Sequence, residues 1–96
     1  MNNIRLLYLV QHTNKEMFKI GIATSNQRFH ELNRDYRIDW NSSLYFKGED
    51  TDITKLEKIL HRLFHKKRFD KQYGTGGTEW FSSDCLEPVI ESILFN

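Results

Sequence analysis

Apolar residues follow two different periods along the chain, and this difference predicts the order of its elements. Compact apolar runs bounded by polar residues predict strands over Arg5–Gln11, Met17–Ala23 and Leu44–Lys47. Apolar residues at helical spacing predict helices over about residues 26–36, 51–67 and 86–94. The order β-β-α-β-α-α predicts an α+β fold in which a small three-stranded antiparallel sheet is flanked by helices.

Local signals add detail to this outline. Gly21 falls inside the second predicted strand, where a glycine often marks the close approach of another group. Thr24 and Ser25 are suitable N-caps for the first helix, so Arg28 falls in its first turn. Backbone N–H groups in a first turn favour a nearby anion. The segment Gly48–Asp50 is predicted to be a turn before the second helix.

The 96 residues suffice for one domain, which we expect to span residues 1–96. No stretch approaches the ~20 apolar residues of a membrane span, and the first residues lack the pattern of a secretory signal. Cys85 is the only cysteine, so no internal disulfide is expected and the residue is predicted to pack in the interior. These features predict a reducing, cytoplasmic compartment.

Charge is nearly balanced overall, with a formal net charge of +1, but it is unevenly distributed. Basic residues crowd the second predicted helix and the segment after it: Lys55, Lys58, Arg62, Lys66, Lys67, Arg68 and Lys71. On charge alone the favoured interpretation is the solvated side of an amphipathic helix, but such a cluster can also neutralise phosphates on one face of a protein. Lys66, Lys67 and Arg68 are therefore candidate nucleic-acid contacts.

Four residues far apart in the sequence carry the groups needed for phosphodiester hydrolysis: Tyr8, Lys19, Arg28 and Glu57. A carboxylate can hold a divalent cation, and fixed positive charge can stabilise a phosphate as negative charge builds on it. A phenol can relay or accept a proton when nearby positive charge lowers its pKa. These residues indicate a nuclease site if the fold brings them together.

The same residues belong to an ordered set of short motifs. In chain order these are Leu6-Leu7-Tyr8, Lys19-Ile20-Gly21, Arg28, Glu57-Lys58-Ile59-Leu60-His61-Arg62-Leu63-Phe64 and Glu79-Trp80-Phe81. The set resembles the GIY-YIG endonuclease superfamily, most closely a small phage and bacterial branch with KIG in place of YIG. The resemblance runs from about Leu6 to Phe95, nearly the whole chain.

The resemblance implies a DNA endonuclease that depends on one Mg²⁺ or Mn²⁺ bound by Glu57. Arg28 would brace the scissile phosphate. Tyr8, with Lys19 beside it, would handle the proton of the attacking water, and His61 would contact the phosphate, the water or the metal ligand. The DNA can be single- or double-stranded, and sequence specificity would be low or would come from a targeting partner or from dimerisation. The protein would act in a bacterial or phage-infected cell.

Each candidate also has a structural alternative. Thr54-x-x-Glu57 fits a capping box, and Tyr8 in an apolar run is ordinarily a core aromatic residue. Lys19 and Arg28 can be exposed surface residues. His61 can be a helix residue whose ring nitrogens find local partners.

The chain also departs from the family pattern, with Lys19 in place of a second tyrosine. A polar residue that steadies the metal-binding glutamate is not evident; Gln72 is the nearest by spacing, and Glu79 as a second ligand is a minor alternative. These departures leave open a catalytically weak or inactive module that binds nucleic acid or inhibits a nuclease. A third alternative is a protein-interaction domain that uses Trp40 or Trp80.

Overall fold

A computed structural model describes residues 3–68 and 80–95 of the chain. In chain order, its strands and α-helices are β1 (Ile4–His12), β2 (Met17–Ala23), α1 (Gln27–Asp35), β3 (Ile38–Glu49), α2 (Asp50–Leu63), β4 (Trp80–Ser82) and α3 (Leu86–Leu94). Short 3₁₀ turns follow α2 at His65–Lys67 and precede α3 at Ser83–Cys85. The predictions for Gln72 and Glu79 concern residues outside the described part of the chain.

Within these residues the strands form one four-stranded antiparallel sheet in the order β3-β1-β2-β4. The predicted α+β fold is confirmed, with one strand more than expected. The additional strand, β4, pairs Trp80 with Lys19 of β2. A strand of three residues is too short to show a period in the sequence. The third strand is longer than predicted, because residues 38–43 belong to it as well.

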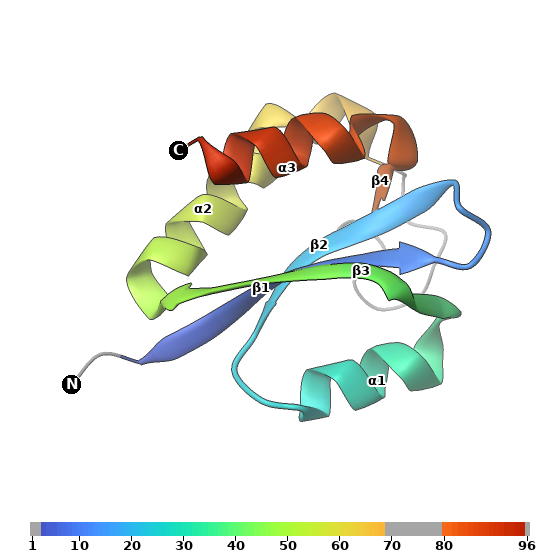
Figure 1. Ribbon diagram of the computed structural model, residues 1–96, viewed down its shortest axis with the longest axis horizontal. Coiled ribbons are helices and arrows are strands. Elements are labelled where there is room, and N and C mark those ends of the chain that lie inside the picture. Colours follow the sequence, from blue (N-terminus) through green and yellow to red (C-terminus); the bar gives the residue numbers. More distant parts are fainter. Residues whose placement is uncertain (1–2, 69–79, 96) are drawn as a thin grey trace.

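Helices cover both faces of the sheet, α1 on one and α2 with α3 on the other (Figure 1). Leu7 and Leu9 of β1 pack in the cluster that α2 and α3 close. Tyr8 and Val10, which alternate with them along β1, pack in the cluster between the sheet and α1. Because both faces are covered, β1 and β2 appear in the sequence as nearly continuous apolar runs.

Helix α2 begins directly where β3 ends, so the predicted turn at Gly48–Asp50 is wrong. Two contacts hold this junction: the Asp50 N–H donates to the Asn3 carbonyl at 2.8 Å, and Arg5 Nε lies 2.9 Å from Asp50 Oδ1. The α-helix ends at Leu63 rather than near Lys67, because the chain tightens there into a 3₁₀ turn. No helix in the described ranges has the length and apolar character to cross a membrane.

Cys85 lies in the core beside α3 and is 3% exposed. Burial is the main cause that raises the pKa of its thiol to about 11. A thiol that stays protonated and inaccessible is a poor nucleophile. The structure thus agrees with the prediction that Cys85 is a packing residue.

Candidate functional site

Tyr8 and Gly21 form one contact across β1 and β2. They are directly paired in the antiparallel register, and Tyr8 is completely buried. A Cβ atom at position 21 would lie 2.2 Å from Tyr8 Oη and 2.3 Å from Tyr8 Cζ. The Tyr8 ring therefore occupies the space above Gly21. The close approach predicted from the glycine is confirmed.

Lys19 is buried on the same face of the sheet as Tyr8. It is 1% exposed, and its Nζ lies 6.0 Å from the centroid of the Trp80 ring on the paired strand β4. A fully buried lysine is rare in proteins, because its charge must be compensated. The face of an indole ring attracts a cation at this separation. The alternative that Lys19 is an exposed strand residue is therefore wrong.

Arg28 meets Lys19 at a polar pocket beside α1. The pocket has a volume of about 270 Å³ and is lined by Lys19, Arg28, Glu31, Leu32, Arg34, Asp35 and Tyr36. Arg28 is the second residue of α1, so its predicted first-turn position is confirmed, although the N-cap is Asn26 rather than Thr24 or Ser25. The helix start and the strand β2 together bring the two cations to one hollow.

Two acidic residues moderate the positive charge of this pocket. Arg34 Nε donates to Asp35 Oδ1 at 2.8 Å, and this hydrogen bond raises the pKa of Arg34 and lowers the pKa of Asp35. Arg28 Nη1 lies 3.5 Å from Glu31 Oε1, which is a long hydrogen bond. Arg34 is thus engaged by its neighbour. Lys19 and Arg28, which has Glu31 as its own acidic neighbour, contribute the other positive charges of the pocket lining.

Glu57 lies on α2, which covers the opposite face of the sheet from α1 (Figure 1). It is half-buried, at the margin of the helix face that buries Ile53 and Leu60. Thr54 lies inside α2 rather than at its N-cap, so the capping-box alternative for Glu57 is wrong. Glu57 stands outside the lining of the pocket that Lys19 and Arg28 share.

The acidic side chains limit the kind of metal that the site can hold. Within the described ranges, no group of three or more His, Cys, Asp or Glu residues could hold a metal ion. A single carboxylate such as Glu57 fits Mg²⁺ or Mn²⁺, which keep several waters and take further oxygen ligands from a phosphate. It does not fit a structural zinc site, which needs four protein ligands.

His61 ties α2 to the strand that carries Lys19. Its Nε2 lies 3.0 Å from the carbonyl oxygen of Ile20, and because a carbonyl only accepts, the imidazole donates this hydrogen bond. The ring also meets Phe81 edge-on, with centroids 5.1 Å apart. Glu57 precedes His61 by about one helical turn. The hydrogen bond thus anchors this part of α2, including Glu57, beside β2.

The basic residues that follow α2 lie along the outer edge of β4. Arg68 forms an isolated antiparallel bridge with Phe81, on the side of β4 away from β2. Lys66, Lys67 and Arg68 are all exposed, and Lys67 Nζ lies 3.4 Å from Asp84 Oδ2. An exposed position suits a nucleic-acid contact and a solvated surface equally, so these residues remain candidates.

Trp80 lies beside Lys19, whereas the sequence predicted it as a packing residue or as part of an apolar protein interface. It is completely buried, and its ring meets His12 and Tyr36 edge-on at centroid distances of 5.9 and 5.1 Å. Because Trp80 is buried, it cannot form the exposed apolar interface of the protein-interaction hypothesis. The one sequence signal for its role is its place in the Glu79-Trp80-Phe81 motif.

The sequence profile of the T5orf172 domain matches residues 5–94. No curated protein and no solved structure matches the chain. The match covers both motif strands, the helix of Arg28 and the helix of Glu57. The chain therefore belongs to the T5orf172 domain family, a group of nuclease-like domains found in phage and bacterial proteins.

Proposed function

We propose that this domain is a metal-dependent DNA endonuclease of the GIY-YIG type. The observation that carries the proposal is the pocket in which the buried Lys19 and the first-turn Arg28 line one hollow. A buried lysine beside a first-turn arginine concentrates positive charge in this hollow, and such charge suits a phosphate. Membership of a nuclease-like family supports the same activity.

Arg28 and Lys19 would hold the scissile phosphate. The guanidinium of Arg28 presents a planar fork of donors that matches two phosphate oxygens, and its place in the first turn adds the field of the helix N-terminus. Lys19 would supply a fixed point charge from the strand. Lys19 is held in place by burial before the substrate arrives, so its stabilisation of the transition state needs little reorganisation.

Glu57 would hold the metal. Because Glu57 lies on the opposite face of the sheet from the Lys19–Arg28 pocket, a Mg²⁺ or Mn²⁺ ion that it holds would supply charge neutralisation only to a phosphate of a strand that extends from the pocket to α2. The donor set fits such a cation, because Glu57 offers one half-buried carboxylate. His61 would act as a positioning residue, since its Nε2 donates to the Ile20 carbonyl and keeps α2 against β2.

Tyr8 would relay the proton of the attacking water. Its hydroxyl is enclosed, so we assign the phenol to a relay behind Lys19 rather than to contact with bulk water. The positive charge of Lys19, on the neighbouring strand and the same face, would favour the phenolate during the transfer.

The enclosed position of Tyr8 also favours a second candidate, a nucleic-acid-binding module without catalysis. Such a module would keep the Lys19–Arg28 pocket for phosphate binding and would not need the phenol. Its binding would weaken with salt, would ignore EDTA and would survive Glu57→Gln.

A plasmid-nicking assay with Mg²⁺, Mn²⁺ and EDTA tests the proposal. We expect nicking with either metal, none with EDTA, and a loss of about a hundredfold or more in rate for Glu57→Gln and for Arg28→Ala. Lys19→Met, which keeps the volume and removes the charge, is expected to lose activity to a similar extent while the protein stays folded.

A matched variant separates the effect of Glu57→Gln from a general loss of charge. Glu87→Gln on α3 alters an exposed glutamate outside the proposed site, and we expect it to cleave at the wild-type rate. If the wild-type protein binds DNA but cleaves it with neither metal, the endonuclease hypothesis is rejected in favour of the non-catalytic binding module. Wild-type protein that does not bind DNA at all would reject both.

A further inference from the structure

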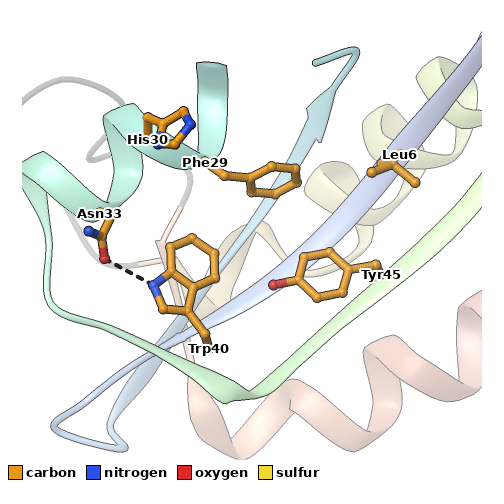
Figure 2. A pocket seen from close by; sticks show the side chains of 6 residues that line it. All are labelled: Leu6, Phe29, His30, Asn33, Trp40 and Tyr45. Atoms are coloured by element: carbon orange, nitrogen blue, oxygen red, sulfur yellow. Dashed lines mark hydrogen bonds between the residues drawn. The ribbon is translucent and has the colours of Figure 1, made fainter. Parts of the chain in front are cut away.

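A second cavity lies on the other side of α1 and has a volume of about 620 Å³ (Figure 2). Aromatic and apolar side chains form most of its lining: Leu6, Phe29, His30, Asn33, Trp40 and Tyr45. This volume is within the roughly 300–1,000 Å³ typical of small-molecule and cofactor sites. The cavity can therefore accept a planar ring of the size of a nucleobase.

Its aromatic rings contact one another in a way that suits a stacked ligand. Phe29 meets Trp40 at a centroid distance of 6.0 Å and an interplanar angle of 79°, and it meets Tyr45 at 5.7 Å and 83°. An edge-on contact places the edge of one ring against one face of its neighbour and leaves the opposite face uncovered by that contact. Tyr45 remains 44% exposed on the outer strand β3. A planar ligand can thus reach the rings from solvent.

Polar groups at the rim match the polar edge of a base. Trp40 Nε1 donates to Asn33 Oδ1 at 3.0 Å, so the amide is oriented and its NH₂ group can donate elsewhere (Figure 2). Burial raises the pKa of Tyr45, so its hydroxyl stays protonated at neutral pH and can donate as well. His30 lines the same cavity from an exposed position on α1.

The cavity adjoins the candidate phosphate pocket through α1. Arg28 lines the polar pocket, and the next residue, Phe29, lines the aromatic cavity. A helix with its side chains is roughly 10–12 Å across, so a few nucleotides of one strand would span both sites. Phe29 also meets Tyr8 edge-on at 5.7 Å, and Tyr45 is paired with Tyr8 across β3 and β1.

Cations on one side of a helix and aromatic faces on the other form the combination that binds single-stranded nucleic acid. We propose that the aromatic cavity of Phe29, Trp40 and Tyr45 binds an unpaired base of the strand whose phosphate lies at Lys19 and Arg28. This inference rests on the proposed function, because it needs a nucleic-acid backbone in the polar pocket. It adds a base subsite and a preference for unpaired nucleotides.

Fluorescence anisotropy with the full chain in EDTA tests the base subsite without cleavage. The probes are a short oligothymidylate and an abasic oligonucleotide of equal length, which has the same phosphates and no bases. We expect the wild type to prefer oligothymidylate, and Tyr45→Ala to weaken that binding about tenfold while abasic binding stays unchanged. Arg28→Ala is expected to weaken binding of both probes.

Two controls isolate the ring of Tyr45. Tyr45→Phe keeps the ring and should bind like the wild type, and Leu63→Ala removes a comparably exposed apolar side chain of α2 outside the cavity. Equal wild-type affinity for the two probes, or normal oligothymidylate binding by Tyr45→Ala, would overturn the base subsite and leave the phosphate pocket standing. Failure of the wild type to bind either probe would overturn this inference, whereas the plasmid-nicking assay with metal decides the proposed function separately.

Discussion

At the scale of single residues, the motif residues of β1 and β2 contact one another or residues of neighbouring strands. Gly21 is required by the ring of Tyr8, which fills the space where a side chain would begin. Lys19 is buried rather than on the surface, because it is paired with Val10 on one side and Trp80 on the other in a sheet face that α1 covers. The identities of Gly21 and Lys19 thus depend on their neighbours on the adjacent strands.

Gly21→Ala tests the contact with Tyr8. The new Cβ would overlap the ring of a completely buried tyrosine, so we expect the free energy of unfolding to fall by about 1–3 kcal/mol, the usual cost of overpacking. Urea unfolding measures this change. Gly48→Ala is the matched control, because its Cβ would lie 3.1 Å from the nearest atoms of Ile53 and should cost less. An equal loss in both variants would contradict this explanation.

At the scale of elements, α2 is positioned by polar contacts at both ends as well as by its apolar face. Asp50 is held at the start by Asn3 and Arg5, and His61 is held near the end by the Ile20 carbonyl. The apolar face with Ile53 and Leu60 fixes which side packs on the sheet. The hydrogen bond from His61 to the Ile20 carbonyl also fixes the position of the helix along β2.

His61→Leu tests this anchoring role. The variant leaves the buried Ile20 carbonyl without its imidazole donor, so we expect a loss of about 1–3 kcal/mol in the free energy of unfolding. We also expect nicking to need a higher metal concentration, because Glu57 is no longer held beside β2. His61→Gln, which restores a donor, should recover part of both properties.

A stability-matched variant separates anchoring from general weakening of the fold. Val89→Ala removes methyl groups from the α3 side of the same core and has no contact with the Ile20 carbonyl. It is expected to lower stability by a similar amount and to leave the metal requirement unchanged. An unchanged metal requirement in His61→Leu would show that His61 serves the fold alone.

At the scale of the whole molecule, the β1–β2 turn is joined to the start of β3 by groups that titrate. Lys15 donates to Asp39, and this bond is the main cause that lowers the pKa of the Asp39 carboxyl. Burial is the main cause that lowers the pKa of His12, with a further contribution from Arg37. Both shifts make the folded protein bind protons less readily than the unfolded chain.

Stability is therefore predicted to fall in two steps as the pH falls. Below the unfolded His pKa of 6.5 the unfolded chain gains a proton that folded His12 resists, and below 3.8 the same holds for Asp39. Urea midpoints measured across this range should decrease through both windows. His12→Gln should flatten the upper window and Asp39→Asn the lower one. A midpoint that rises on acidification would contradict the sign of both shifts.

The sequence by itself determined the α+β class, the start of α1 near Arg28 and the close approach at Gly21. These features depend on period, helix position and glycine geometry, which are local properties of the chain. The strand β4 was not predicted from the sequence, because three residues are too few to show a strand period. The cap and turn assignments failed because tertiary contacts, such as those of Asp50, decide where helices begin.

Only the tertiary structure decided how the candidate residues are divided in space. Sequence spacing could nominate Lys19 and Arg28, but the pairing of β2 with β4 and the packing of α1 place them at one pocket. The same packing puts Glu57 on the helix of the opposite face and builds the aromatic cavity from β1, α1 and β3. Contacts between residues distant in sequence depend on which faces pack together, and no local pattern contains that information.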